Sequence, residues 1–247
     1  ELFAALSASE TAFINMEDER IAALPTKAKK VAYGFSEKAD IWADAIEVKA
    51  GKMVFVLHHA GKSQAASFPM IGRHHVLNAV SVYAMAIHLG LAPDLILQRM
   101  ASFQMKMHRG EIVRRGTITM IDDTYNANPD SMNKSLHALA EGYSGKGMVA
   151  VLGEMLELGE NSQALHAEVG ALVKELGCEA LYAYGPQAKA YLEGFGYEGE
   201  EAGSHFFNDH TIMAEALNKK YRGKENTVML FKGSRGMAME KVLELIG

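Results

Sequence analysis

IDDTYNANPDS, residues 121–131, is the stretch that decides the fold of this chain. The alternating apolar run 116–121 precedes it and predicts a strand, and the periodic segment 131–143 follows it and predicts a helix. Asn128 suits the N-cap of that helix, and Pro129 suits its first position. Open α/β sheets bind ligands at the turns that leave the carboxyl ends of their strands. The stretch therefore predicts a ligand-facing turn in an α/β domain.

The same turn is crowded with acidic and amide side chains, although a plain helix cap needs only one of them. The crowded positions are Asp122, Asp123, Asn126, Asn128 and Asp130. Such groups suit the hydroxyl and ammonium groups of a ligand. The alternative is an ordinary capped turn without a ligand, and the local pattern alone leaves both open.

The composition is typical of a soluble globular protein with one large domain or two ordinary ones. The chain has 247 residues, of which 49% are hydrophobic and 22% are charged, and its net charge is -5. This charge gives no basic field to hold nucleic acid, and no apolar run reaches membrane-spanning length. A single cysteine, Cys178, cannot form an internal disulfide, which favours a reducing compartment such as the cytoplasm.

From residue 111 onward, predicted strands and helices alternate. The strands are predicted at 117–122, 147–152, 179–184, 204–207 and 226–232. The helices are predicted at 129–143, 161–177, 186–194, 209–222 and 236–246. Because parallel strands are joined by right-handed crossovers, this alternation predicts a Rossmann-like, mostly parallel sheet.

The first part of the chain has a different pattern of predicted elements. Its alternating runs are separated by Ala-Gly turns and predict antiparallel hairpins from three segments, 40–48, 52–58 and 64–70. Shorter strands are predicted at 11–16 and 29–35, and helices at 1–9, 72–90 and 93–103. We place a boundary near residues 108–111 and expect two domains, residues 1–108 and 109–247.

Two further loops follow predicted strands of the second domain. GEMLELG, residues 153–159, has Glu154 facing a ligand in one interpretation and is a simple packed loop in the other. KGSRG, residues 232–236, has two glycines that let the backbone approach a ligand, and its Lys232 and Arg235 suit carboxylate or phosphate. The alternative is a structural loop with two surface cations. In a mostly parallel sheet, both loops leave the same edge as the first turn.

Several other chemistries lack their sequence patterns. The chain has no Ser-His-Asp order, no zinc-ligand spacing and no G-x-G-x-x-G fingerprint. GKS, residues 61–63, resembles the end of a P-loop, but Val56 stands where that loop needs its first glycine. His74 and His75 point about 100° apart on a helix, so no metal site is expected from them.

Four blocks of sequence resemble the Mur ligases, ATP-dependent enzymes that form amide bonds in peptidoglycan synthesis. The blocks are GRHHVLNAV (72–80), IDDTYNANPDSM (121–132), VLGEMLELGENSQALHAEVG (151–170) and FKGSRGMAMEKV (231–242). A Mur ligase has three domains. The resemblance implies that this chain holds the end of the central ATPase domain and the whole Rossmann-like third domain. The Walker loop and the magnesium ligands are then expected upstream of Glu1, in an N-terminal part of the same protein.

The resemblance also implies roles for single residues. Arg109 matches a linker arginine that reaches ATP phosphates and is the expected catalytic residue, although His108 stands where the family usually has glycine. The residues expected to bind ATP are His75, which replaces the usual Asn, together with Asn78, Asp123, Tyr125 and Asn126. The residues expected to bind substrate are Glu154, which replaces the usual Asp, together with Lys232, Ser234 and Arg235. Ser234 is also predicted to cap the final helix.

The resembled branch of the family adds D-Ala-D-Ala to UDP-N-acetylmuramoyl-tripeptide. In that reaction ATP and Mg2+ activate a substrate carboxylate as an acyl phosphate, which the dipeptide amine attacks. We expect the intact enzyme to work in the cytoplasm with a hinge at residues 108–111, and this chain alone to be inactive. The alternatives are another Mur or folylpolyglutamate-type ligase and a non-catalytic nucleotide-binding module. An oxidoreductase fits the fold but lacks the glycine fingerprint.

Overall fold

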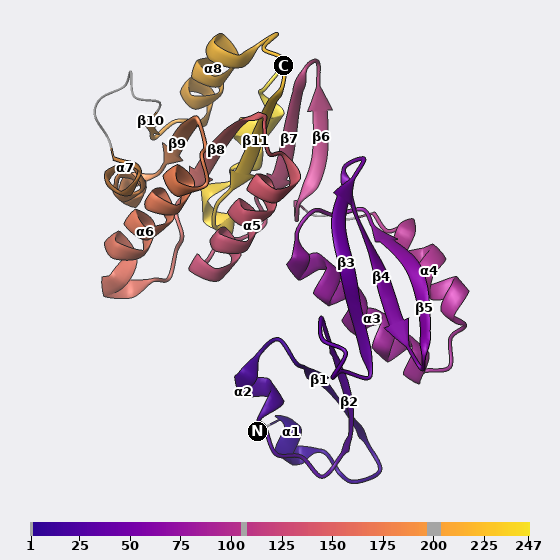
Figure 1. Ribbon diagram of the computed structural model, residues 1–247. Coiled ribbons are helices and arrows are strands. Elements are labelled where there is room, and N and C mark those ends of the chain that lie inside the picture. The colour runs from indigo at the N-terminus through magenta and orange to yellow at the C-terminus, as the bar shows by residue number, and fades with distance from the viewer. Residues whose placement is uncertain (1, 105–107, 197–203) are drawn as a thin grey trace. The chain divides into compact units, whose positions relative to one another are not determined.

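The computed structural model describes residues 2–104, 108–196 and 204–247. The chain forms two compact units, residues 1–104 and residues 105–247, and each unit has its own sheet and hydrophobic core (Figure 1). The predicted domain boundary after residue 108 lies close to this division. The assignment of residues 1–108 to the end of a central domain and of residues 109–247 to a third domain stays a prediction.

The first unit contains a five-stranded sheet in the order β1-β2-β3-β4-β5. Its strands are β1 (Thr11–Asn15), β2 (Lys29–Gly34), β3 (Ile41–Lys49), β4 (Lys52–His59) and β5 (Lys62–Phe68). The last three strands pair antiparallel, as predicted, whereas β1, β2 and β3 pair parallel. Both hairpin turns hold two residues with positive φ, Ala50-Gly51 and Ala60-Gly61, which matches the twist of the flanking strands.

Two longer helices, α3 (Arg73–His88) and α4 (Pro93–Ala101), pack on one face of this sheet. The face of α3 that is buried repeats every three to four residues, as an amphipathic helix requires: Val76, Ala79, Val80, Tyr83 and Ala84. The sheet meets it with alternate residues of β4, namely Met53, Phe55 and Leu57. Two short helices complete the unit, α1 (Leu2–Ala5) and α2 (Glu19–Ala22).

The second unit contains a six-stranded sheet in the order β10-β9-β8-β11-β7-β6. Its strands are β6 (Glu111–Arg115), β7 (Ile118–Asp123), β8 (Gly147–Gly153), β9 (Ala180–Tyr184), β10 (Ser204–Phe207) and β11 (Thr227–Lys232). All pairs are parallel except β6 with β7, so the predicted mostly parallel sheet is confirmed. All residues of β11 are buried, as expected for a strand that is covered on both faces.

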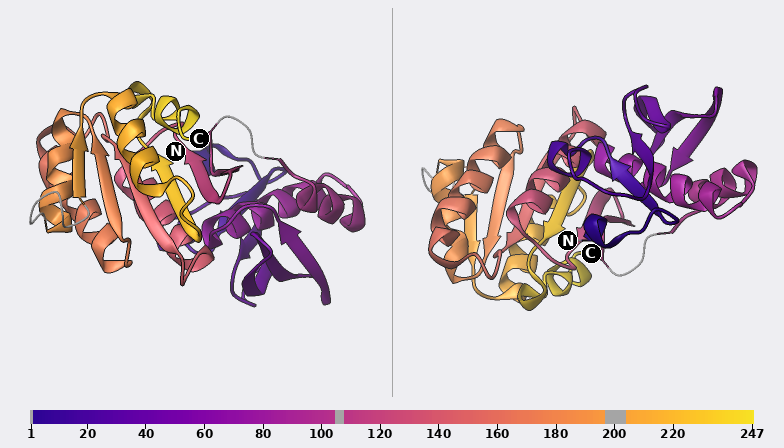
Figure 2. Two further views of the ribbon diagram at one scale, coloured as in Figure 1. Left: turned by 90° about the horizontal axis from the view of Figure 1, so that it is seen from above. Right: turned by 90° about the horizontal axis from the view of Figure 1, so that it is seen from below.

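Helices lie on both faces of this sheet (Figure 2). The helices are α5 (Pro129–Gly142), α6 (Ser162–Glu175), α7 (Lys189–Phe195), α8 (His210–Tyr221) and α9 (Glu240–Glu244). Residues of α8 and α9 share a core with Met120, Val151 and Phe231 of the sheet. The predicted final helix is shorter than expected, because a 3-10 turn, η4 (Arg235–Met237), precedes α9.

Helices α6 and α7 approach each other through two glycines. A Cβ atom added to Gly170 would lie 1.9 Å from the carbonyl oxygen of Tyr191, and one added to Gly194 would lie 1.8 Å from that of Ala167. Any side chain at either position would therefore push the helices apart. Helix α7 also packs against β9 and β10, so this contact sets the packing of that layer.

Candidate functional site

The carboxyl ends of β7, β8 and β11 meet at one rim of the second sheet. In the strand register, Lys232 at the end of β11 lies opposite Asp123 of β7 and Leu152 of β8. Because the three strands are parallel neighbours, the loops that follow them leave from the same edge. The expectation that the turn 121–131 and the loops 153–159 and 232–236 leave the same edge of the sheet is therefore confirmed.

Ser234 ties these three loops together. Its hydroxyl donates a hydrogen bond to the carbonyl of Ala127 (3.2 Å) and accepts one from the N–H of Leu156 (2.9 Å). Its own N–H donates to the carbonyl of Glu154 (2.9 Å). The side chain is buried, and it makes no capping bond to the following turn, so the predicted cap is wrong. Ser234 thus links its own loop to the other two loops of the rim through hydrogen bonds.

Lys232 forms a buried ion pair with Asp123. Its Nζ lies 2.7 Å from Asp123 Oδ2 and donates a second hydrogen bond to the carbonyl of Asn126 (3.0 Å). Asp123 Oδ2 also accepts a hydrogen bond from the hydroxyl of Ser135 on α5 (2.7 Å). The Lys232 side chain is 3% exposed, against 19% for Asp123. Its charge is therefore engaged within the protein rather than presented to solvent.

Arg109 lies against the turn 121–131. Its guanidinium carbon is 3.9 Å from the centre of the Tyr125 ring, a cation–π contact. The Arg109 side chain is exposed, and the Asn126 side chain next to Tyr125 is exposed as well. The structure thus brings the predicted catalytic arginine against Tyr125, one of the three predicted ATP-binding residues of this turn.

The helix that follows this turn begins as predicted. Asn128 is the N-cap of α5, and its side-chain oxygen accepts a hydrogen bond from the N–H of Ser131 (2.8 Å). The Ser131 hydroxyl accepts in return from the N–H of Asn128 (3.0 Å), which completes a capping box. Pro129 occupies the first helical position.

Glu154 is turned away from solvent. Its side chain is buried, and its Oε1 accepts a hydrogen bond from the N–H of Gln187 at the start of the 3-10 turn η2 (Pro186–Ala188), which leads into α7. A carboxylate at this helix start is favourable, because backbone N–H groups there lack partners. A role in substrate binding would require Glu154 to leave this contact.

The loop around Glu154 is held by a histidine that the sequence analysis did not identify. His166 is fully buried on α6, and its Nε2 accepts a hydrogen bond from the N–H of Met155 (3.0 Å). Its Nδ1 lies 2.6 Å from the carbonyl of Ser162, to which it donates. The only sequence signal was a histidine in an apolar helix face. Met155 is buried, as the alternative of a simple packed loop predicts, whereas Leu156 is 42% exposed.

The loop KGSRG approaches the protein itself. A Cβ atom added to Gly233 would lie 3.0 Å from the Cα of Gly153 and 2.8 Å from the Met239 side chain. Gly233 thus allows its loop to contact the loop that begins at Gly153, whereas we had expected it to let the backbone approach a ligand. Arg235 remains largely exposed, and its Nη2 lies 2.7 Å from Glu240 Oε1. The sequence analysis did not predict the ion pair with Glu240, because the position of Glu240 relative to Arg235 depends on where η4 ends.

Another residue pair missed by the sequence analysis lies at the start of the unit. His108 Nδ1 is 2.7 Å from Asp122 Oδ2. This hydrogen bond raises the pKa of His108 above its ordinary value, against the opposing effect of burial. Strand alternation turns Asp122 to the opposite face from Asp123, which is the only sequence signal that the two aspartates differ.

The other two predicted ATP-binding residues lie in the first unit. His75 and Asn78 both belong to the opening turns of α3, and the N–H of His75 donates to the carbonyl of Gly72 (3.0 Å). The rings of His74 and His75 lie 3.9 Å apart. Asn78 is exposed, and its backbone carbonyl accepts a hydrogen bond from the Ser81 hydroxyl (2.7 Å).

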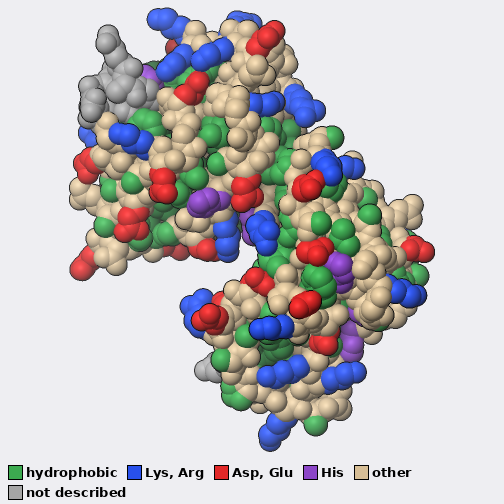
Figure 3. Space-filling model, in the orientation of Figure 1, with side chains coloured by type: hydrophobic (Ala, Val, Ile, Leu, Met, Phe, Trp, Pro, Cys, Tyr) green, Lys and Arg blue, Asp and Glu red, His purple; other side chains and the backbone are tan. Residues whose placement is uncertain are grey.

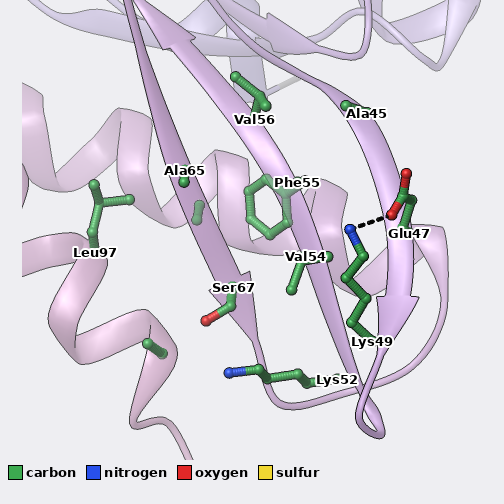
Figure 4. Close-up of a pocket in the computed structure, with 12 residues that line it drawn as sticks. Ala45, Glu47, Lys49, Lys52, Val54, Phe55, Val56, Ala65, Ser67 and Leu97 are labelled. Atoms are coloured by element: carbon green, nitrogen blue, oxygen red, sulfur yellow. Dashed lines mark ion pairs between the residues drawn. The ribbon is translucent and has the colours of Figure 1, made fainter.

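A separate groove of about 510 Å³ also lies in the first unit (Figure 4). It is lined by residues of β3, β4, β5 and α4, among them Val54, Val56 and Leu97. Lys49 and Glu47 form an ion pair of 2.6 Å at its side. None of the predicted site residues lines this groove.

Acidic and basic side chains are interspersed over the face that Figure 3 shows. In the described parts of the chain, no group of three or more His, Cys, Asp or Glu side chains is placed to hold a metal ion. Nor is any helix of these parts both long and apolar enough to cross a bilayer.

The fold and the rim define a class of protein. It is a two-unit α/β protein whose second unit is Rossmann-like and carries polar and charged side chains where β7, β8 and β11 end. The family model described as "Mur ligase, glutamate ligase domain" matches residues 108–235, and the one described as "Mur ligase middle domain" matches residues 1–86. The chain belongs to the Mur ligase family.

Its curated relatives include enzymes named UDP-N-acetylmuramoyl-tripeptide--D-alanyl-D-alanine ligase. That of Escherichia coli K12 is 31% identical over 84% of this chain and 44% of its own length. That of Haemophilus influenzae is 29% identical over 98% of this chain and 52% of its own length. The chain spans about half the length of these relatives.

Solved structures agree with this assignment. MurF from Acinetobacter baumannii has a TM-score of 0.82 and 28% identity, and covers 95% of this chain and 51% of its own. MurF ligase from Thermotoga maritima in complex with ADP has a TM-score of 0.83 and 23% identity, over 99% of this chain and 54% of its own. The second likeness shows the fold.

Proposed function

We propose that this chain is part of an ATP-dependent ligase that adds D-Ala-D-Ala to UDP-N-acetylmuramoyl-tripeptide in peptidoglycan synthesis. The observation that carries this proposal is the shared rim, where Arg109, Tyr125 and Asp123 come together within the part of the chain that matches the ligase family. The names of the relatives support the choice of substrates. The cytoplasm, where such precursors would be made, suits a chain with one unpaired cysteine.

Arg109 is the proposed catalytic residue. ATP, when bound, supplies the phosphoryl group that activates the substrate carboxylate. Charge spreads over the phosphate oxygens during such a transfer, and a guanidinium can neutralise it. The Tyr125 ring offers its face to this guanidinium and so restricts where the charge can lie.

Asp123 is the proposed acceptor for ribose hydroxyls. Both hydrogen bonds described for its carboxylate end on Oδ2, from Lys232 and Ser135. Oδ1 is therefore the oxygen that we assign to a ligand. Lys232 fixes the direction of the carboxylate, because its buried ammonium lies 2.7 Å from Oδ2. We accordingly propose that Lys232 supports the nucleotide site rather than the incoming dipeptide.

Arg235 is the proposed contact for the dipeptide carboxylate, because it is the exposed cation of its loop. His75 and Asn78 keep their proposed place near the adenine. Mg2+ would assist the phosphoryl transfer, but the described residues do not form a site for it, and we assign it no ligand in this chain.

An acceptor screen tests the proposed reaction. The ligase that contains this chain is given ATP and UDP-N-acetylmuramoyl-tripeptide, and phosphate release is followed with D-Ala-D-Ala, with single amino acids and with glutamate on a folate acceptor. Turnover that depends on D-Ala-D-Ala supports the proposal. Turnover with glutamate or a single amino acid instead would indicate another ligase of the family. Nucleotide binding without turnover on any acceptor would indicate a non-catalytic module.

A further inference from the structure

The first described residue of the second unit, His108, has an unfavourable backbone conformation. His108 has φ of 58°, in the left-handed region that glycine adopts without cost. A side chain in this region costs about 1 kcal/mol, and surrounding contacts must offset it.

Two contacts hold it, one through the side chain and one through the backbone. The imidazole Nδ1 lies 2.7 Å from Asp122 Oδ2, and the carbonyl of His108 accepts a hydrogen bond from the N–H of Tyr125 (3.0 Å). The Asp122 side chain is 5% exposed and that of His108 is 40% exposed, so the proton of the imidazole can still exchange with solvent.

The two carboxylate oxygens of Asp122 have different partners, and one of them contacts His108. Its Oδ1 accepts hydrogen bonds from the hydroxyl of Thr124 (2.8 Å) and from the N–H of the same residue (3.3 Å). These donors fix the direction of the carboxylate, and its Oδ2 is left for His108. The charged groups that face His108 are Asp122 on β7, Glu240 on α9 and Arg235 on η4; the first two favour the imidazolium and Arg235 opposes it.

The residue between the two anchors is Arg109. On its other side, the N–H of Gly110 donates to the carbonyl of Asp122 (2.7 Å). Residues 108 and 110 are thus both fastened to the end of β7. The backbone of Arg109 is fixed between them, and its guanidinium lies 3.9 Å from the centre of the Tyr125 ring.

We propose that His108 is a positioning residue for Arg109: its imidazolium, paired with Asp122, fastens the start of the second unit to β7 and holds the Arg109 guanidinium over Tyr125, and loss of the proton loosens this hold. The consequence for catalysis rests on the proposed function, which gives Arg109 its role.

The direction of the pH dependence follows from the raised pKa of His108. The stabilising contribution of the pair is fully present below the unfolded value of about 6.5. It is lost as the pH rises through the higher value of the folded protein. Arg109 should therefore be held most firmly on the acidic side of neutrality.

An NMR titration of the 247-residue chain without nucleotide tests the positioning. The signals are the imidazole of His108, the Tyr125 ring protons and the Nε–H of Arg109. In the wild type, all three should change with one midpoint above about 6.5. His108→Gly suits the left-handed backbone, removes the imidazole and should abolish the change at Tyr125 and Arg109 while the chain stays folded. Asp122→Asn keeps the shape of the side chain and should shift the His108 midpoint down toward about 6.5.

The result that would overturn the inference is a Tyr125 or Arg109 signal that is flat in the wild type, or that keeps its midpoint in His108→Gly. Because these spectra contain no substrate, the outcome is independent of whether the ligase activity is correct. In the ligase itself, the KM for ATP should rise with pH in the wild type and should be independent of the same proton in His108→Gly. Absence of any turnover would count against the proposed function and leave the NMR result standing.

Discussion

Lys232 shows how far a site residue can be predicted from its type alone. A lysine after a buried strand indicated a cation at the ligand edge, and the edge is correct. The pattern could not show that the same lysine would find a carboxylate on the neighbouring strand, because that pairing depends on the strand order β8-β11-β7. Ser234 and Glu154 were also placed at the right rim, while their partners depend on how the loops fold back.

The buried pair gives a residue-scale prediction. Lys232→Met leaves the Asp123 carboxylate without its cation, and we expect the free energy of unfolding to fall by about 3 kcal/mol. Urea denaturation of this chain measures it. Lys134→Met is the matched control, because its pair with Asp130 is exposed and should contribute about 0.5 kcal/mol or less. Equal effects for the two variants would contradict the structural role of Lys232.

The lone cysteine gives a second prediction at this scale. Burial raises the pKa of the Cys178 thiol to about 11. The stabilising effect of the neutral thiol is present below the unfolded value of about 8.5 and is lost as the pH rises through the folded value. At about pH 8, an aromatic disulfide reagent should label the folded chain slowly and the urea-unfolded chain rapidly. Fast labelling of the folded chain would show that Cys178 is accessible.

At the scale of elements, periodicity predicted the regular strands and helices of both units well. The parallel strands of the second unit and the helices α5, α6 and α8 begin and end within a few residues of the predicted positions. Strand β6 was missed, because an edge strand such as EIVRR needs little apolar surface. Helix α2 was missed because it has a single turn and depends on its Asp18 cap.

The crossing of α6 and α7 provides the prediction for this scale. Gly194→Ala places a methyl group against the backbone of Ala167, and we expect a loss of about 3 kcal/mol of stability or failure to fold. Gly147→Ala is the control, because the three atoms nearest to its new Cβ all belong to the flexible Glu179 side chain. Thermal unfolding of both variants checks this. A Gly194→Ala protein as stable as Gly147→Ala would mean that the helices are further apart than described.

At the scale of the molecule, the chain spans about half the length of its curated relatives and contains no P-loop pattern. We expect the 247-residue chain alone to bind ATP more weakly than micromolar, because the contacts that we propose for it are limited to ribose, adenine and, through Arg109, phosphate. Calorimetric titration with ATP measures this directly. Micromolar affinity would show that these residues form a complete nucleotide site.

The central claim is that Arg109, held over Tyr125 at the rim, neutralises phosphate charge in a ligase reaction. The most direct measurement is the kcat of Arg109→Ala in the ligase that contains this chain, with ATP, UDP-N-acetylmuramoyl-tripeptide and D-Ala-D-Ala. Arg99→Ala, an exposed arginine of α4, serves as the control. We predict that kcat falls by about 100-fold or more in Arg109→Ala and is unchanged in the control. A folded Arg109→Ala enzyme with the kcat of the wild type would contradict the account.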